Sequence, residues 1–296
     1  MAVSPAWFLR LAALELFALW LIVTTGAAVR LTASGLGCRH WPGCEAGHPL
    51  PAKDYHAYIE FGNRVLGGVT ILITFLVALT VLRTPLGRRS KQLAGAIFVG
   101  ALAQAPLGYL AVKTDLRWPV VAAHLLLSML LIAAAVVLVL MSYELVGGRA
   151  EPVAPVELQR LGLGIAVAGL ALLVSGALAT AAGPHSGGGT EHVHRLARLE
   201  PVVYVHAGVV AAFGCSFLFM LGYLASRRAT APRLFRAALA VLGVILAQVG
   251  LGELQYRLHL PWYLVLIHVA VAAAAWLCVV ALVTALWRPP AALART

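Results

Sequence analysis

The sequence has few charged side chains. Asp, Glu, Lys and Arg make up only 11% of its 296 residues, whereas an ordinary soluble domain carries about 25%. Hydrophobic residues make up 61%, and the mean hydropathy is +0.91. This composition excludes a soluble globular protein and makes lipid the expected solvent. One membrane helix needs about 20 apolar residues, so this length has room for about eight spans and none for a separate soluble domain.

Acidic residues are especially scarce. The chain has 11 Asp and Glu against 22 Lys and Arg, which gives a formal net charge of +11. In a soluble protein this excess would suggest a nucleic-acid partner. Here the basic residues lie between apolar runs and form no single stripe. The surface of a lipid bilayer explains them better, and we expect no nucleic-acid partner.

Apolar runs recur along the whole chain and predict an all-α integral membrane protein with eight transmembrane helices. The runs cover residues 7–29, 62–82, 92–112, 118–141, 161–182, 202–225, 234–254 and 262–287. The first run exceeds 20 residues and has no clear small-residue cleavage site before Arg30. We therefore interpret it as a retained span and not as a removed signal peptide.

Basic residues in the short connections predict the orientation, because Lys and Arg accumulate on the cytoplasmic side. They crowd the connections after the second and sixth runs, namely Arg83, Arg88, Arg89, Lys91, Arg227, Arg228, Arg233 and Arg236. Both termini of this multi-pass cell-membrane protein are therefore expected in the cytoplasm. Basic residues in the outer connections weaken the contrast: Arg30, Arg39, Lys53, Arg195 and Arg198.

Two of the four cysteines lie close together in the first outer connection, in the run CRHWPGC. Cys38 and Cys44 could close a small disulfide ring, which is the favoured interpretation because disulfides persist outside the cytosol. A metal site formed by Cys38, His40 and Cys44 is the alternative. The other two cysteines, Cys215 and Cys278, lie within the sixth and eighth runs.

The chain repeats itself. It reads LAQAPLGYL around Gln104 and LAQVGLGEL around Gln248, and each glutamine is followed 20 residues later by a histidine, His124 or His268. A weaker echo pairs TTGAAVRLTASG at 24–35 with VSGALATAAGPHSG at 174–187. These matches predict two pseudo-symmetric four-helix bundles, residues 1–150 and 151–296. Each has an even number of spans, so the axis relating them would lie along the membrane normal.

Three histidines fall inside the apolar runs, where ionisable groups are costly and usually functional. His124, His206 and His268 are expected at similar depth below the outer surface. His206 and His268 would lie on neighbouring helices of the second bundle, and two imidazoles across a bundle core commonly hold heme iron. A hydrogen-bonded packing role for each histidine, or a proton relay, is the alternative.

In the first half the position that matches His206 is Asn63, in the run EFGNR. Asparagine is a poor iron ligand, so His124 alone is expected to hold a heme there. That asymmetry is typical of a substrate pocket beside a cofactor pocket.

Four residues apart on one helix face, Glu60 and Arg64 form either an interfacial ion pair or a catalytic carboxylate with its partner. Glu15 and Glu253 are further candidates for buried carboxylates.

Taken together, these residues resemble the heme A synthases, which convert heme O to heme A for terminal oxidases. The resemblance covers nearly the whole chain through the eight spans, CRHWPGC, EFGNR, GPHSGG at 183–188 and the histidines of the fourth, sixth and eighth spans. It implies a heme b cofactor on His206 and His268, a substrate heme O on His124, and an essential glutamate at Glu60.

The resemblance also implies cofactor-binding roles near the N-terminal heme for Asn63 and Arg64, and a disulfide between Cys38 and Cys44. Many family members have a histidine where this chain has Asn63. Expected partners are the bilayer, an unidentified electron donor and the enzyme that makes heme O. Two alternatives compete with this function: a diheme membrane cytochrome b that exchanges electrons with quinone, and a transporter.

Overall fold

The computed structural model describes residues 3–38, 40–45, 47, 50–51, 54–148, 151, 154–188, 193 and 195–291. Within this part of the chain, eight α-helices are long and apolar enough to cross a membrane. They are α1 (Pro5–Leu31), α2 (Tyr55–Thr80), α3 (Arg88–Lys113), α4 (Trp118–Gly147), α5 (Val156–Ala182), α6 (Leu199–Ser226), α7 (Pro232–Arg257) and α8 (Trp262–Trp287), with a short 3-10 turn at Val81–Arg83. The prediction of an all-α, multi-pass membrane protein is confirmed.

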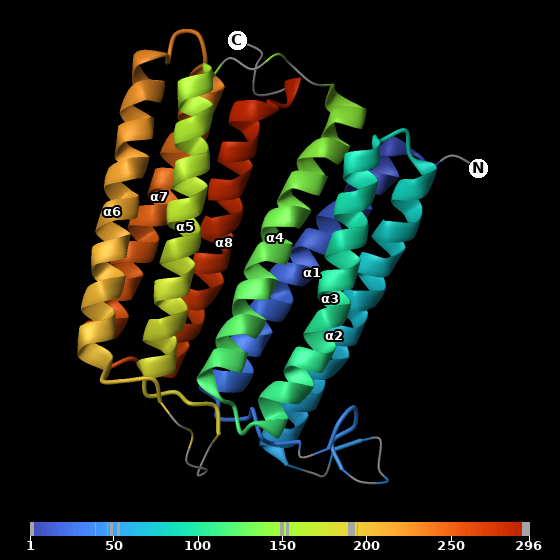
Figure 1. Ribbon diagram of the computed structural model, residues 1–296, viewed down its shortest axis with the longest axis vertical. Helices are drawn as coiled ribbons and strands as arrows, with labels where there is room; N and C mark the ends of the chain where they lie inside the picture. Colours follow the sequence, from blue (N-terminus) through green and yellow to red (C-terminus); the bar gives the residue numbers. More distant parts are fainter. Residues whose placement is uncertain are drawn as a thin grey trace.

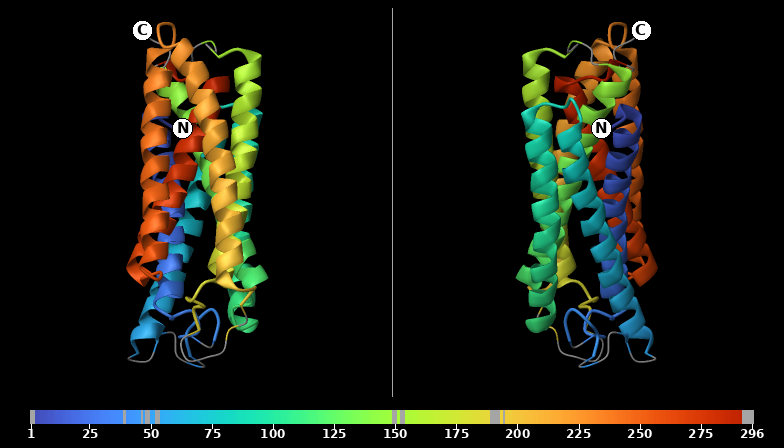
Figure 2. Two further views of the ribbon diagram at one scale, coloured as in Figure 1. Left: turned by 90° about the vertical axis from the view of Figure 1, so that its left-hand side faces the viewer. Right: turned by 90° about the vertical axis from the view of Figure 1, so that its right-hand side faces the viewer.

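The helices form two groups of four that stand side by side, α1–α4 and α5–α8 (Figure 1). In the first group α1 packs on α2 and α4, and α3 closes the ring between them. In the second group α5 packs on α6 and α8, and α7 closes the ring in the same way. Views from the two sides show the helices running along the length of the molecule (Figure 2). Helix α1 begins, and α8 ends, at the end opposite the longest loops (Figure 1).

The two groups meet where α8 packs on α1 and α4, and where α4 packs on α5. Two tryptophans bond across this boundary. The indole N–H of Trp20 on α1 donates to the carbonyl of Ala270 at 3.0 Å, and that of Trp276 on α8 donates to the carbonyl of Met129 at 2.9 Å. Since an indole N–H needs a partner when it is shielded from water, these bonds hold α8 against α1 and α4 of the first group.

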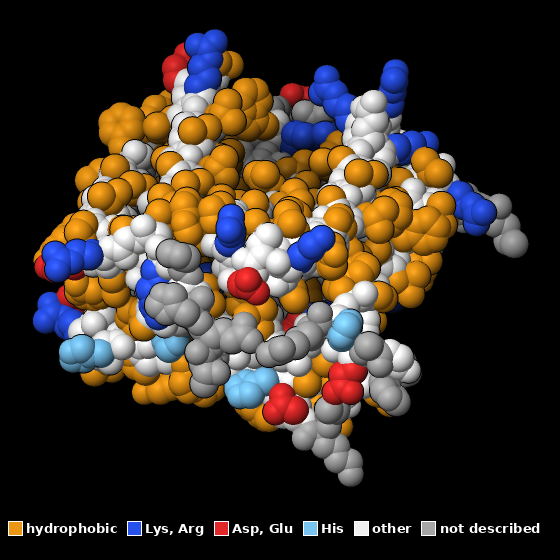
Figure 3. All heavy atoms as spheres, turned by 60° about the horizontal axis from the view of Figure 1, so that its bottom comes forward, with side chains coloured by type: hydrophobic (Ala, Val, Ile, Leu, Met, Phe, Trp, Pro, Cys, Tyr) orange, Lys and Arg blue, Asp and Glu red, His pale blue; other side chains and the backbone are white. Residues whose placement is uncertain are grey.

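The molecule has apolar flanks, and its polar groups gather at the ends. Seen toward the end that carries the longest loops, apolar side chains cover the flanks, while histidine and acidic side chains lie at that end (Figure 3). Phe219 on α6 is 69% exposed. Such exposure of a large aromatic ring is unfavourable in water and ordinary in lipid, so it agrees with a membrane environment.

Six of the eight helices begin earlier than the apolar runs predicted, and α2 differs most. Helix α2 begins at Tyr55 and not at residue 62, and Asp54 caps it by accepting a hydrogen bond from the backbone N–H of Ala57 at 3.0 Å. The early turns of α2 carry charged side chains, so the hydropathy of the sequence falls there although the helix continues. Helix α6 begins at Leu199 and not at residue 202.

The turns α3–α4 and α7–α8 have the same backbone geometry. Each contains two successive residues in the left-handed region, which non-glycine residues rarely adopt; they are Asp115, Leu116, His259 and Leu260, with φ between 52° and 61°. In each turn the N–H of the second residue donates to the carbonyl five positions earlier, at 2.8 Å and 2.7 Å. Helices α4 and α8 therefore leave their turns in the same way.

Candidate functional site

The three membrane-embedded histidines lie at one level. His124 and His268 are six residues into α4 and α8, and His206 is seven residues into α6. At a rise of about 1.5 Å per residue, all three lie roughly 9–10 Å from the loop end of their helices. Helices α6 and α8 are separated by α5 and α7 in the ring. His206 and His268 therefore lie on diagonally opposite helices of the second group, and the expectation of neighbouring helices is wrong.

His206 is held by two consecutive residues of α5. The hydroxyl of Ser175 lies 2.8 Å from ring Nδ1 and also donates to the carbonyl of Leu172 at 2.9 Å. A Cβ built on Gly176 would lie 3.3 Å from Cε1 of the His206 ring, so the ring packs on bare helix backbone. A larger residue at position 176 would push the imidazole away.

His268 is held by two residues of α7. The side-chain amide nitrogen of Gln248 lies 3.1 Å from ring Nε2 and donates to the backbone carbonyl of His268 at 3.0 Å. A Cβ on Gly252 would lie 3.1 Å from Cε1 of the ring. Ring Nδ1 is buried and has no hydrogen-bond partner among the described residues.

His124 repeats this arrangement on α3 and α4 with one difference. The amide of Gln104 donates to the backbone carbonyl of His124 at 3.2 Å and to the hydroxyl of Ser128 at 2.7 Å. It therefore holds the helix beside the ring and makes no hydrogen bond to the ring. Ring Nδ1 is again buried without a partner in the described part of the chain. Gly108 backs the ring more loosely, with 3.8 Å from a built Cβ to Cε1.

Asn63 lies on α2, which is diagonally opposite α4 in the first group just as α6 is opposite α8 in the second. The hydroxyl of Thr25 on α1 donates to its side-chain oxygen at 2.8 Å, and a Cβ on Gly26 would lie 4.0 Å from its amide nitrogen. Thr25 and Gly26 thus hold Asn63 much as the Ser–Gly pair of α5 holds the histidine of α6. The sequence prediction that Asn63 matches that histidine agrees with these contacts.

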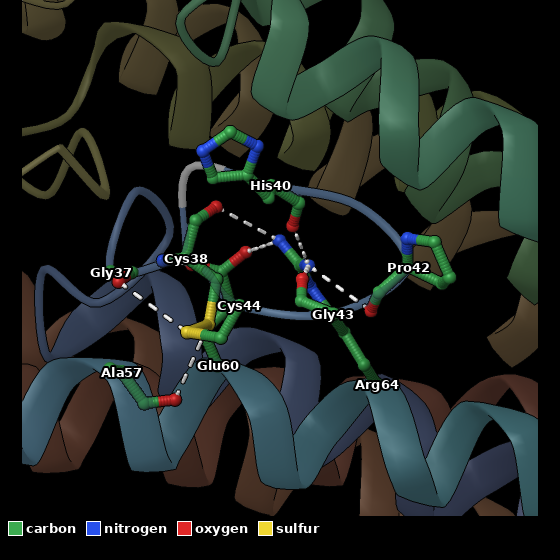
Figure 4. A network of polar contacts seen from close by, with 9 residues as sticks. All are labelled: Gly37, Cys38, His40, Pro42, Gly43, Cys44, Ala57, Glu60 and Arg64. Carbon is green, nitrogen blue, oxygen red and sulfur yellow. Dashed lines mark hydrogen bonds and ion pairs between the residues drawn. A yellow bond between two sulfur atoms is a disulfide. The ribbon is translucent and has the colours of Figure 1, made fainter. Parts of the chain in front are cut away.

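Glu60 and Arg64 lie near the loop end of α2, beneath the cysteine loop (Figure 4). Their side chains form a direct ion pair, and both are largely buried. The backbone N–H of Cys38 donates to the other carboxylate oxygen of Glu60 at 2.7 Å. Arg64 donates to the carbonyls of His40 and Gly43, each at 2.6 Å, and to that of Cys38 at 3.1 Å. The pair therefore clamps the loop onto the helix.

The sulfurs of Cys38 and Cys44 form a disulfide, with the two Cα atoms 4.3 Å apart. Both residues are buried against Ala57 of α2. The predicted disulfide is confirmed, and the alternative metal site is wrong because the two sulfurs are bonded to each other. The ring that they close is the part of the loop whose carbonyls face Arg64 (Figure 4).

Arg30 joins the two groups at their loop end, and two further side chains bind the loops of the second group. Arg30 on α1 donates to the carbonyls of Thr180 and His185, each at 2.8 Å. The ring of His185 lies 2.8 Å from the carbonyl of Leu260, and Arg195 donates to the carbonyl of Pro184 at 2.7 Å. These side chains therefore hold the loops together. Arg39 and Lys53 lie outside the described residues.

The two other carboxylate candidates have opposite environments. Glu15 on α1 is fully buried, and neither of its oxygens has a hydrogen-bond partner among the described residues. Glu253 on α7 is exposed and forms an ion pair with Arg257. The prediction of a buried carboxylate holds for Glu15 and is wrong for Glu253, whose side chain is 57% exposed near the loop end of α7.

Sequence reasoning missed the hydroxyl groups and glycines that support the side chains of Asn63 and His206. Thr25, Gly26, Ser175 and Gly176 stand in the matching segments TTGAAVR and VSGALAT, so the signal was present. Its meaning depends on which helices are adjacent, because α1 supports α2 and α5 supports α6. That adjacency becomes visible only in the fold.

Comparison with known proteins gives the family of this chain. Residues 9–280 match the COX15-CtaA family model, described as cytochrome oxidase assembly protein. The chain belongs to the heme A synthase family. It is 26% identical to the heme A synthase of Shewanella oneidensis, with 98% of each chain covered, and 30% identical to that of Bacillus pumilus over 50% of this chain and 49% of the relative.

A further relative is a larger polypeptide. A protoheme IX farnesyltransferase of Thermus thermophilus is 32% identical over 95% of this chain but only 49% of its own length. The chain thus spans about half the length of this relative and of the Bacillus protein.

Membership of the heme A synthase family implies a heme-using enzyme, and the residues of the second group fit such a group. Imidazole is a common ligand of heme iron. His206 and His268 present imidazoles from opposite helices, and Nδ1 of His268 has unused hydrogen-bonding capacity in the described structure. Buried polar atoms without partners are rare in proteins and usually have a function.

Proposed function

We propose that the protein oxidises the methyl group of heme O to the formyl group of heme A within the membrane. Family membership supports the reaction class. The observation that carries the assignment to residues is the pair of imidazoles at one level on diagonal helices of the second group, His206 and His268, with one imidazole and one amide at the matching positions of the first group.

Heme b is the proposed cofactor of the second group, residues 151–296. His206 and His268 would hold its iron from opposite helices. When bound, heme b supplies an electron path, which amino-acid side chains cannot provide for the oxidation of a methyl group. The chain itself fixes the two rings through Ser175 and Gln248 and surrounds them with apolar helix surface.

Heme O is the proposed substrate of the first group, residues 1–150. His124 would bind it, and Asn63 would lie on the opposite side, where an amide makes a poor iron ligand. A single strong ligand favours exchange, since a substrate must enter and its product must leave. A cofactor held by two histidines would remain in place. The difference between Asn63 and His206 therefore fits a substrate pocket beside a cofactor pocket.

Glu60 is the proposed catalytic residue. It precedes Asn63 on α2 by nearly one helical turn, toward the loop end, so it lies at the rim of the proposed substrate pocket. Converting the methyl group to a formyl group adds one oxygen atom and removes two hydrogen atoms, so it requires proton transfer together with an oxygen source and an external redox partner. The carboxylate of Glu60, held by Arg64 and by the N–H of Cys38, would transfer protons between the reacting carbon and the loop end of α2.

The proposed surroundings follow from the charges and the relatives. The basic connections after α2 and α6 support a cytoplasmic location for both termini. A relative named as a protoheme IX farnesyltransferase contains a region similar to nearly all of this chain. We take this as support for a partnership with the enzyme that makes heme O. The electron donor is a further partner.

A product assay tests the proposed function. The chain is expressed with a source of heme O, and the extracted hemes are analysed for the formyl product. We expect heme A from the wild-type protein and about 100- to 10,000-fold less from Glu60→Ala, with the heme b spectrum retained. Glu253→Ala is the matched control, because its carboxylate is exposed at the end of α7. Unchanged heme O in the wild type would favour the diheme cytochrome, and normal product from Glu60→Ala would remove its catalytic role.

A further inference from the structure

We propose that Ser175 and Gln248 are positioning residues that make the two heme-ligating imidazoles unequal. Ser175 leaves Nε2 of His206 ready to bind iron, whereas Gln248 engages Nε2 of His268 and competes with the metal. The inference rests on the proposed function, since it requires a heme between these rings. It concerns two polar side chains, one on α5 beside α6 and one on α7 beside α8. Each can be removed without removing a proposed ligand.

The hydroxyl of Ser175 has a single hydrogen to donate. The proposal assigns that hydrogen to the carbonyl of Leu172, 2.9 Å away in the same helix. The serine oxygen is then the acceptor at the 2.8 Å contact with Nδ1 of His206, where the tautomer of the ring decides the roles. With this assignment His206 carries its proton on Nδ1 and its lone pair on Nε2.

The lone pair of His206 is free to meet a metal. In the described part of the chain no hydrogen bond reaches Nε2. A hydrogen bond from the distal ring nitrogen to an acceptor fixes the tautomer and raises the basicity of a metal-ligating histidine. Gly176 packs directly on the ring and restricts its tilt. Ser175 and Gly176 thus present His206 as a strong, oriented ligand.

Gln248 acts on His268 in the opposite sense. Its amide nitrogen is only a donor, and it lies 3.1 Å from Nε2 of the ring and 3.0 Å from the backbone carbonyl of the same residue. Exchanging the amide nitrogen and oxygen would place oxygen against that carbonyl, so the orientation is determined. The lone pair of Nε2 is therefore already engaged, and the ring hydrogen sits on Nδ1, which is buried and unpartnered in the described structure.

The first helix group supplies a comparison for Gln248. Gln104 makes the same bond to the backbone carbonyl of its histidine, but its second hydrogen goes to Ser128. Gln104 therefore shares the structural role of Gln248 and lacks the contact with the ring. On α5, Thr180 provides a second comparison, because its hydroxyl bonds only to the carbonyl of Gly176 at 2.8 Å.

The first experiment removes the hydroxyl group of Ser175, the proposed hydrogen-bond acceptor for Nδ1 of His206. Heme-loaded wild type, Ser175→Ala, Ser175→Thr and Thr180→Ala are compared by midpoint potential, by low-spin electron paramagnetic resonance and by the rate of heme b transfer to an apo-globin. We expect Ser175→Ala to lose heme about 10- to 100-fold faster and to show a higher potential, because a less basic imidazole stabilises ferric iron less. Ser175→Thr should restore both properties, and Thr180→Ala should match the wild type.

The second experiment removes the side-chain amide of Gln248, which is proposed to compete with iron for Nε2 of His268. In Gln248→Leu, heme b uptake should be faster and its release no faster than in the wild type, whereas Gln104→Leu should leave both rates of the C-terminal heme unchanged. The proposal is overturned if Ser175→Ala matches the wild type in potential and resonance spectrum, or if Gln248→Leu loosens heme as Ser175→Ala does. A wild-type protein without a low-spin bis-histidine heme would instead overturn the proposed function itself.

Discussion

The two helix groups hold different side chains on the same supports. A hydroxyl and a glycine of the first helix support a residue of the second in both groups, through Thr25 in one and Ser175 in the other. A glutamine of the third helix is bonded to the histidine-bearing fourth helix in both. The supported residues are Asn63 in α1–α4 and His206 in α5–α8. We propose that the groups are pseudo-symmetric repeats that diverged at the ligand while keeping its support.

The disulfide loop and the buried carboxyl of Glu15 are two further features of the first group. The clamped disulfide loop covers α2, and the buried carboxyl of Glu15 lies in the core of the first group. At the position of α5 that aligns with Glu15 through the Thr–Gly and Ser–Gly pairs, the second group has Ile165, which is 1% exposed. The first group thus has the two buried carboxyl groups and an amide at the proposed ligand position, while the second has an apolar residue in place of Glu15 and imidazoles at both proposed ligand positions. A substrate site and a permanent cofactor site would differ in this way.

Exchanging the unmatched ligands should have the largest effect. In His206→Asn, the second group loses its iron ligand but keeps an amide that Ser175 can hold, so we expect the low-spin bis-histidine heme signal to disappear. In Asn63→His, the first group gains a second imidazole, and we expect it to retain heme O or heme A and to turn over more slowly. Absorption and resonance spectra of the purified proteins, with hemes extracted and quantified, measure both effects.

A matched pair of controls isolates the ligand from the fold. Thr25→Ala removes the support of Asn63 without changing the second group, so its heme b spectrum should match the wild type. A bis-histidine signal that persists in His206→Asn would contradict the assignment of the cofactor to α6 and α8.

Each group also has one glutamate–arginine pair spaced four residues apart, and the two pairs should differ in energy. Glu60 and Arg64 are 7% and 15% exposed, whereas Glu253 and Arg257 are 57% and 75% exposed. Arg64→Leu would leave a buried carboxylate and several loop carbonyls without their donor, at a cost of about 3–5 kcal/mol. Arg257→Leu should cost about 0–1 kcal/mol. Thermal unfolding in detergent measures both, and faster reduction of the Cys38–Cys44 disulfide should accompany only the first.

Equal destabilisation by these two arginine variants would show that the clamp adds no stability beyond a surface ion pair. Arg64→Lys tests the geometry further. A single ammonium cannot reach the carbonyls of His40 and Gly43 and the carboxylate of Glu60 with the same fork of donors, so this variant should recover only part of the loss.

Much of the fold could be predicted because lipid imposes a simple rule. Each span must be a long apolar helix, so the runs of the sequence predicted the spans. The rule fails where charges neutralise each other within a helix, and it therefore missed the first turns of α2, where Glu60 pairs with Arg64. It also misplaced Glu253, because hydropathy alone does not locate the outer end of α7.

The site was predicted in part for a similar reason. Histidines are conspicuous in apolar helices, and the repeat made His124 and His268 comparable. Serine, threonine and glycine are common in membrane helices, so the repeated segment that contains Ser175 did not indicate a support for His206 until α5 was known to lie beside α6. The diagonal placement of His206 and His268 likewise follows from the packing order of the helices, which the sequence does not state.

The buried carboxyl of the first group offers a smaller test of the comparison. Glu15→Ile places in the first group the isoleucine that the second group has at the aligned position, Ile165. It also removes a polar group with no partner among the described residues. We expect a gain of about 1–3 kcal/mol in stability. The reverse change, Ile165→Glu, should cost about 3 kcal/mol at membrane depth. Thermal unfolding in detergent compares the two, and a loss of stability in Glu15→Ile would mean that the carboxyl is satisfied in the native protein.

The smallest expected difference concerns the glycines behind the two repeated histidines. A Cβ at Gly252 would lie 3.1 Å from Cε1 of His268, which is tighter than ordinary contact, whereas a Cβ at Gly108 would lie 3.8 Å from Cε1 of His124. Gly252→Ala should therefore shift the His268 ring by a few tenths of an ångström, change the resonance spectrum of heme b, and offset the gain of about 1 kcal/mol that alanine brings to a helix. Gly108→Ala should keep that gain and leave the same spectrum unchanged. Because both substitutions add one methyl group to equivalent helices, a spectrum altered equally by both would show that the two rings are not packed differently, and it would weaken the contrast between a tightly held cofactor ligand and a looser substrate ligand.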